Sequence, residues 1–313
     1  MATTDGATSD LRFVDAHVHF WDHEIEGIHW PYLDPGFDHP RLRGMHRLDA
    51  PRFTDYEFVE QTGPFVPRRI VHVQSCTEDR PGLESTWVQS IADERGLVGA
   101  IIAKARVAEP DLAHVIAANS CRLLRGFRDM SSPQSIGTSE FTAGFDLIAA
   151  SGWSLEVLVP YPKFVDVCAL ADRHPATTVV LGHAGQPEHR DAEYFAAWSS
   201  ALEQFRHRPN VVVKISALAS GADPDWSVES IRPWVETCLD VFGSHRAMFA
   251  TNWPIDRLYG SYAQLLEAYV SIASTLATPD RSNVFADTAT RVYDIGEAAP
   301  PDTELATRKV EHS

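Results

Sequence analysis

The stretch FVDAHVHFW, residues 13–21, decides between two α/β folds. It begins as a short apolar and β-branched run of the kind that forms a buried strand. The run continues directly into two histidines, His17 and His19, with no glycine beside them. An open, doubly wound sheet would place a glycine-rich, phosphate-binding turn after its first strand. The stretch therefore favours a closed barrel.

Seven further runs of this kind follow, and helical patterns separate most of them. The predicted strands are residues 12–19, 69–76, 97–104, 123–129, 153–159, 177–183, 211–217 and 246–252. The predicted helices are residues 81–95, 111–119, 144–151, 163–173, 192–207, 231–242 and 262–276. Eight strands alternating with helices are typical of a (β/α)₈ TIM barrel. We therefore expect one α/β barrel domain over residues 12–295, with a disordered N-terminus at 1–11 and a flexible tail at 296–313.

One long segment, residues 22–54, has no periodicity of its own and is rich in Trp, Tyr, Pro and His. Loops of this length are usually functional. It leaves the carboxyl end of the first predicted strand, and active sites of TIM barrels lie at the carboxyl ends of their strands. We expect this insertion to fold over the catalytic face.

The composition excludes several classes of partner. Among 313 residues, 44% are hydrophobic and the formal net charge is −16, which argues against nucleic acid or an anionic membrane as a partner. No run approaches the roughly 18 apolar residues of a membrane span. The four cysteines are far apart and form no C-x-x-C pair, which disfavours a disulfide scaffold. We expect a cytoplasmic protein with a small-molecule substrate, and a homodimer stays open.

Polar residues that could do chemistry fall at or near the ends of the predicted strands. His17 and His19 are two apart, so a strand holds both imidazoles on one side. A carboxylate inside a barrel, such as Glu156, is costly unless it is paired or binds a metal. The further candidates are Arg128 in the fourth strand, His183 in the sixth, Lys214 in the seventh and Asn252 in the eighth.

Several segments resemble one known family in order and spacing. They are FVDAHVHFWD (13–22), VHVQS (71–75), RGFR (125–128), VVLGHAGQP (179–187), NVVVKISAL (210–218) and FATNWP (249–254). The chain is similar in these segments to the lactonase-rich branch of the amidohydrolase superfamily. The resemblance implies a TIM-barrel hydrolase of lactones or related cyclic esters. It also implies that His17 and His19 form the first-strand pair and that His183 is the sixth-strand histidine.

Two positions depart from the superfamily pattern. The eighth strand usually ends in an aspartate that binds metal and takes a proton from water, but this chain has Asn252 there. A neutral amide cannot act as a general base at neutral pH. The fifth strand offers Glu156 in place of the histidine that commonly completes a metal site. Asp256 could supply a carboxylate from the following loop, or it could pair with Arg257 or another cation.

Two catalytic routes therefore remain open. In the first, a divalent ion, most plausibly zinc, binds His17, His19 and His183, and Glu156 or water completes its coordination. In the second, Arg128 and Lys214 polarise the ester without a metal while a histidine takes the proton. Asn252 and Asp256 are further catalytic candidates, and Ser75, Glu156, Arg128 and Lys214 are candidate substrate contacts.

Three other functions fit the same resemblance. A related branch contains metal-dependent decarboxylases, although these use the aspartate that Asn252 replaces. Some relatives isomerise lactones without a metal. A barrel that lost its catalytic base could also be a ligand-binding protein, and Asn252→Asp would then create activity.

Overall fold

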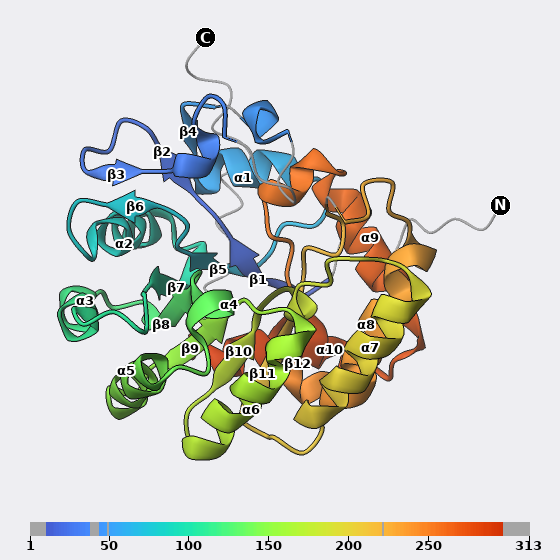
Figure 1. The fold of residues 1–313 in the computed structure, drawn as a ribbon. Helices are drawn as coiled ribbons and strands as arrows, with labels where there is room; N and C mark the ends of the chain where they lie inside the picture. The colour runs from blue at the N-terminus through green and yellow to red at the C-terminus, as the bar shows by residue number, and fades with distance from the viewer. Residues whose placement is uncertain (1–10, 38–43, 49, 221, 297–313) are drawn as a thin grey trace, which may run out of the picture.

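The computed structural model describes residues 11–37, 44–48, 50–220 and 222–296, and it shows a TIM barrel (Figure 1). Its main sheet contains eight parallel strands in the order β1-β5-β7-β8-β9-β10-β11-β12. These strands are β1 (Val14–Val18), β5 (Arg69–Val73), β7 (Val98–Lys104), β8 (Leu124–Asp129), β9 (Ser154–Val157), β10 (Val179–Leu181), β11 (Val211–Ile215) and β12 (Ala247–Phe249). The barrel closes where Val18 forms a bridge with Trp253 and the His19 N–H donates to the Trp253 carbonyl. The prediction of a (β/α)₈ barrel is confirmed.

Helices surround the sheet (Figure 1). The longer ones are α1 (Asp55–Gln61), α2 (Leu83–Arg95), α3 (Leu112–Ala118), α5 (Ser139–Ala150), α6 (Phe164–Arg173), α7 (Ala192–Leu202), α8 (Val228–Phe242) and α9 (Tyr262–Ile272). The shorter α4 (Ser132–Ser135), α10 (Thr278–Ser282) and α11 (Thr288–Val292) complete the set. Helices α5 and α8 begin earlier than predicted because Thr138 and Ser227 cap their N-termini, with side-chain oxygens that accept backbone N–H groups.

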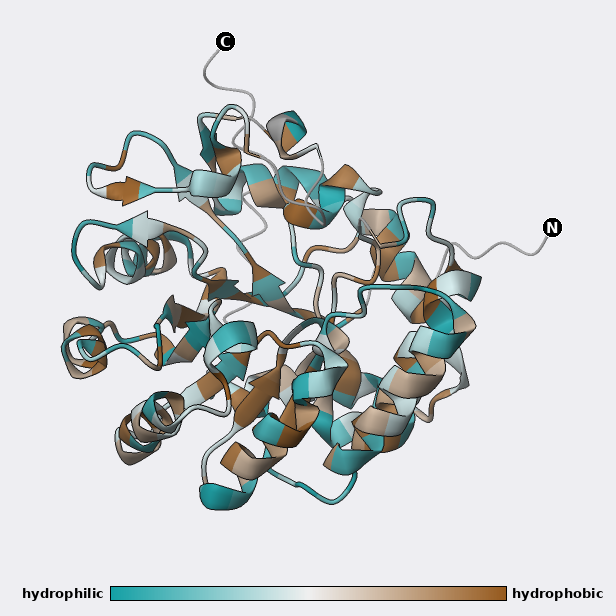
Figure 2. Ribbon diagram, viewed as in Figure 1, coloured by the Kyte–Doolittle hydropathy of each residue, from teal (hydrophilic) through white to brown (hydrophobic). Residues whose placement is uncertain are grey.

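The apolar core has two layers. A large cluster fills the space between the strands and the outer helices, and a smaller one fills the barrel. The inner cluster consists mostly of small and β-branched side chains, among them Val71, Ala100, Val180 and Val212. Figure 2 shows hydrophobic residues concentrated along the strands, whereas the outer helices are mixed. The interior is therefore a packed core, and polar side chains enter it only at particular positions.

The insertion after β1 contains short ordered elements. They are β2 (Trp21–Asp22), β3 (Ile28–His29), β4 (Arg52–Phe53) and the 3₁₀ turns η1 (Pro31–Leu33) and η2 (Met45–Leu48). The strand β3 pairs with β6 (Thr77–Glu78), which follows β5. The Tyr32 hydroxyl lies 2.8 Å from Ser75 Oγ, and Arg47 donates to the Leu258 carbonyl. The described part of the insertion therefore lies over the carboxyl ends of β5 and β12, as expected.

The expected tails fall almost entirely outside the described residues, apart from Leu11 and Gly296. Within the described residues, none of the helices has the length and apolar character needed to cross a membrane.

Candidate active site

Three loops at the carboxyl ends of neighbouring strands have unusual backbone geometry. His183, Ala217 and Asn252 follow β10, β11 and β12, and their φ angles are 52°, 53° and 55°. Residues other than glycine rarely adopt this left-handed conformation, and such strain tends to occur at functional sites. The predicted strands 177–183 and 246–252 are therefore too long. His183 lies in the 3₁₀ turn η4 (Gly182–Gly185), and Asn252 lies three residues after β12.

The first-strand histidines meet inside the barrel mouth. The register between β1 and β5 shifts between Asp15 and Val18, a stretch that contains His17 and immediately precedes His19. Their Nε2 atoms lie 3.1 Å apart. His19 Nδ1 lies 2.7 Å from the Val73 carbonyl, which can only accept, so Nδ1 carries the proton and Nε2 presents a lone pair.

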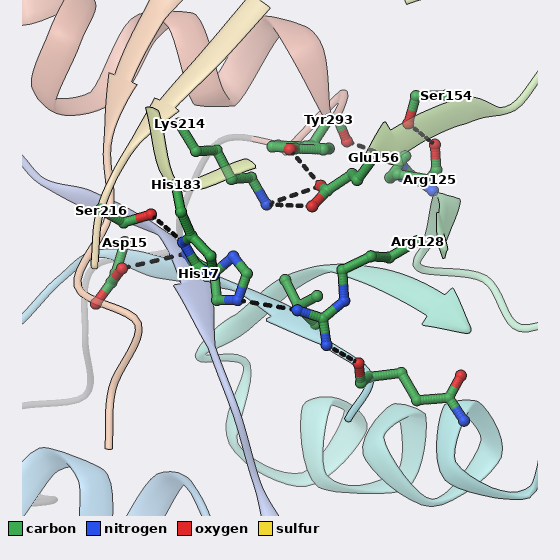
Figure 3. Close-up of polar contacts among 12 residues, drawn as sticks. Asp15, His17, Arg125, Arg128, Ser154, Glu156, His183, Lys214, Ser216 and Tyr293 are labelled. Carbon is green, nitrogen blue, oxygen red and sulfur yellow. Dashed lines mark hydrogen bonds and ion pairs between the residues drawn. The ribbon is translucent and has the colours of Figure 1, made fainter. Parts of the chain in front are cut away.

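His183 joins this pair from the other side of the barrel. Its ring centroid lies 4.6 Å from that of His17, and its Nδ1 atom lies 2.7 Å from Ser216 Oγ (Figure 3). Ser216 immediately follows β11, so that strand orients a histidine supplied by the loop after β10. The structure thus brings together the three histidines that the sequence singled out.

Arg128 reaches the histidines from the end of β8. Its Nη1 lies 3.4 Å from His17 Nε2, and its Nη2 donates to the Gln74 carbonyl (Figure 3). Its Nε is buried and has no acceptor among the described residues. The neighbouring Asp129 instead accepts from Val107 N and from Ser131. The guanidinium is therefore a buried cation aimed at the histidines.

Lys214 and Glu156 lie beside the histidines but are paired with each other. Lys214 Nζ donates to both carboxylate oxygens, at 2.7 and 2.9 Å, and both side chains are fully buried. The Tyr293 hydroxyl donates to Glu156 Oε1 at 2.6 Å (Figure 3). Tyr293 enters from the amino-terminal ends of the strands, where its carbonyl accepts from Arg125. Both candidates thus lie in the barrel, engaged by protein partners.

Asn252 and Asp256 form a second pair. Asn252 Nδ2 donates to Asp256 Oδ1 at 2.8 Å, and both residues are buried. Burial raises the pKa of Asp256 well above its ordinary value. No ion pair between Asp256 and Arg257 forms among the described residues, and Asn252 is the partner of this carboxyl group. Ser75, the remaining candidate, contacts Tyr32 of the insertion.

The electrostatics keep His17 and His19 neutral. Burial, followed by the nearby His183 and Lys214, holds the pKa of His17 well below its ordinary value. Burial and the positive charge of Arg128 lower the pKa of His19 to about 3. Burial also lowers the pKa of Lys214, against the opposing effect of Glu156. At neutral pH the site therefore combines the uncharged imidazoles of His17 and His19 with a cationic guanidinium.

A catalytic zinc ion usually has three protein ligands. The Nε2 atoms of His17 and His19 are spaced like two ligands of one ion, and the Nδ1 contacts of His19 and His183 resemble those that orient metal ligands. However, the described residues contain no group of three or more His, Cys, Asp or Glu side chains placed to hold a metal. Arg128 adds positive charge beside His17. The arrangement does not fit a three-ligand site, and zinc stays a prediction.

Three residues around the site were missed by sequence reasoning. Asp15 accepts from the Thr251 N–H and hydroxyl and from the Tyr262 hydroxyl, and so ties β1 to the loop after β12. Gln74 holds Arg128, and Tyr293 binds Glu156. Asp15 is a carboxylate in a buried strand, which was a usable signal. Gln74 acts through its backbone and Tyr293 is remote in sequence, so neither gave one.

Comparisons with known proteins agree with the fold. The family model described as Amidohydrolase matches residues 14–295. The chain therefore belongs to the amidohydrolase family and is an enzyme of that family.

Its relatives are lactonases and a protein without assigned function. An uncharacterized protein, y4mH of Sinorhizobium fredii, is 29% identical, covering 92% of this chain and 100% of the relative. The L-fucono-1,5-lactonase of Burkholderia multivorans is 27% identical over 93% of this chain and 98% of its own length. Among solved structures, an amidohydrolase from Burkholderia multivorans with bound Zn superposes with a TM-score of 0.76 at 26% identity, covering 91% of this chain and 100% of that one.

Proposed function

We propose that this enzyme hydrolyses a lactone of a small organic acid and that Arg128 and His17 carry out the reaction. The observation that carries the proposal is the 3.4 Å approach of the Arg128 guanidinium to an uncharged histidine at the barrel mouth. A cation and a neutral imidazole are what ester hydrolysis requires: one stabilises the oxyanion and the other moves a proton. The L-fucono-1,5-lactonase similarity supports the choice of ester.

The reaction follows from the positions of these groups. His17 accepts a proton from water as the water oxygen attacks the lactone carbonyl carbon. Arg128 stabilises the negative charge that develops on the carbonyl oxygen. This charge also offsets the cations that lower the pKa of His17, so the imidazole becomes more basic as the reaction proceeds. The ring C–O bond then breaks, and the proton passes from His17 to the departing alkoxide, which gives a hydroxy acid.

The supporting residues keep this geometry. Val73 fixes the tautomer of His19, and Ser216 orients His183, which packs against the His17 ring. The loop after β12 places Asn252 against Asp256, to whose carboxyl group it donates. If a divalent ion binds His17 and His19, it would supply a Lewis acid, and the roles of Arg128 in binding and of His183 in positioning would remain.

The test is a pH-indicator hydrolysis screen of sugar-acid and aromatic-derived lactones. It compares wild type with His17→Ala and His183→Ala, with and without a chelator. Loss of a general base costs about 10²–10⁴-fold in rate. His189→Ala is the matched control, because His189 lies in the same loop as His183 but is exposed.

The outcomes separate the alternatives. Turnover that His17→Ala abolishes and the chelator leaves intact supports the Arg128 route. Chelator-sensitive turnover assigns the first step to a metal. No turnover of any lactone overturns the proposal. Assays of decarboxylation, of lactone isomerisation and of ligand binding without turnover then test the alternatives.

A further inference from the structure

A second arginine at the carboxyl ends of the strands shares an unusual feature with Arg128. Among the described residues, Arg128 and Arg190 are the arginines with buried N–H groups that lack an acceptor. Arg128 belongs to the catalytic site. Arg190 lies between β10 and α7, in the segment that leaves His183, and the mechanism above does not use it.

The guanidinium of Arg190 is held in a fixed orientation. Its Nη2 donates to the Leu218 carbonyl at 2.9 Å. Its Cζ lies 4.8 Å from the centre of the Trp234 ring, a cation–π contact on α8. Trp234 itself packs against Trp198, with ring centroids 4.8 Å apart. One corner and one face of the planar group are therefore fixed, and Nε and Nη1 point their N–H groups in set directions.

These two N–H groups have no acceptor among the described residues. Leaving a buried donor of a charged group unsatisfied is destabilising, so such a group calls for an explanation, such as a ligand that completes it. Burial lowers the pKa of Arg190, but a guanidinium stays charged. The group is thus a preorganised cation with two unused donors.

Arg190 lies close to the catalytic residues along the chain. Leu218, its carbonyl partner, is two residues after Ser216, which orients His183. Two residues span at most about 7 Å between Cα atoms. The distance from Ser216 to the carbonyl that anchors Arg190 is therefore comparable to the length of a small organic acid.

We infer that Arg190 anchors an anionic group, a carboxylate, on the substrate at a distance from the reacting ester. A planar guanidinium with free donors matches a carboxylate in charge and shape. The inference rests on the proposed function, since it names the class of lactone as one that carries a free carboxylate. It adds a binding residue that the catalytic scheme does not require.

The experiment measures binding, so it does not depend on turnover. Glutarate, a five-carbon dicarboxylate, is titrated calorimetrically into wild type, Arg190→Met and Arg190→Lys in a buffer without phosphate or sulfate. Arg106→Met is the matched control, because Arg106 is an exposed cation just after β7 at the same end of the barrel. The monoamide of glutarate is the matched ligand with one charge fewer.

We expect glutarate to bind wild type and Arg106→Met alike and Arg190→Met about tenfold more weakly or worse, the loss of one charge-assisted contact. Wild type should bind the monoamide with similar weakness. Arg190→Lys keeps the charge without the planar guanidinium and should bind glutarate several-fold more weakly than wild type. This variant replaces Arg190→Met in the test if Arg190→Met does not fold. No binding to wild type, or equal losses in Arg106→Met and Arg190→Met, overturns the inference. Lactone turnover, measured separately, tests the proposed function.

Discussion

Two buried polar clusters lie side by side in this barrel and are built on opposite principles. The ion-pair cluster comprises Lys214, Glu156 and Tyr293, and each side chain is bonded to another of the three. The histidine cluster comprises His17, His19, His183 and Arg128. There, His17 Nδ1 and Arg128 Nε are buried without a partner among the described residues.

The difference shows which cluster holds the fold and which one is available for chemistry. Paired charges inside a barrel satisfy each other. Removing one of them leaves the other as an uncompensated buried charge, which destabilises the fold. Arg128 lies beside neutral imidazoles and forms no ion pair among the described residues, so part of its interaction energy remains available for a charge that develops during reaction. We therefore expect mutations in the two clusters to separate stability from activity.

Lys214→Met should have the largest effect, and the effect should be on stability. It leaves Glu156 as an uncompensated buried carboxylate, which typically costs about 3–5 kcal/mol of unfolding free energy. The double variant Lys214→Met/Glu156→Gln removes both charges and should recover a large part of this loss. Urea unfolding of wild type, Lys214→Met, Glu156→Gln and the double variant measures the coupling between the two side chains. A loss in the double variant equal to the sum of the two single-variant losses would show that the pair contributes nothing as a pair.

Arg128→Met should have the opposite signature. It removes the group that faces the developing oxyanion, so we expect a loss of about 10²–10³-fold in kcat, as for the removal of other oxyanion donors. Unfolding free energy should change by less than about 1 kcal/mol or increase, because the cation is only partly satisfied. Arg106→Met, at the same end of the barrel, should alter neither quantity. A variant that lost stability in step with activity would make Arg128 structural.

Part of this division could be predicted from the sequence. The eight strands were found because their β-branched runs are distinct, and His17, His19 and His183 were found because they end such runs. The pairing of Lys214 with Glu156 was not predicted, because β10 lies between the strands that carry these two residues. Val180 on β10 lies opposite Glu156 on one side and Val212 on the other, and Lys214 is two residues beyond Val212 on β11.

The backbone conformation at the site could not be predicted from the sequence either. His183 and Asn252 were placed in strands, whereas both lie in left-handed turns beyond them. Sequence periodicity reports which residues are buried, but it does not report a turn that neither glycine nor proline marks. The β1 irregularity between Asp15 and Val18, at the position of His17, is another such case.

Asp15 is intermediate between the ion-pair cluster and the histidine cluster. Four hydrogen-bond donors satisfy its carboxylate, but no cation pairs with it among the described residues. Burial raises its pKa from 3.8 to about 6, so the folded protein holds this proton more tightly than the unfolded chain. The unfolding free energy should therefore fall as pH rises from about 4 to 6, by roughly 3 kcal/mol from this group. Asp15→Asn should flatten that part of the stability curve, measured by urea unfolding at each pH. An unchanged dependence of the unfolding free energy on pH in Asp15→Asn would show that another group causes it.

The smallest expected effect concerns the acid limb of the activity profile. Arg128 contributes to the lowered pKa of both His17 and His19, with burial the larger cause. Neutral imidazole is the active form, so kcat/KM should hold as pH falls below 6.5 and decline only at a lower pH. The Arg128→Lys variant keeps a cation at this position, so the acid limb should stay at the same pH as in wild type. In Arg128→Met it should move towards higher pH, because one repelling charge is gone while burial remains. An acid limb at the same pH in both variants would mean that Arg128 acts on the substrate alone and leaves the proton affinity of the histidines unchanged.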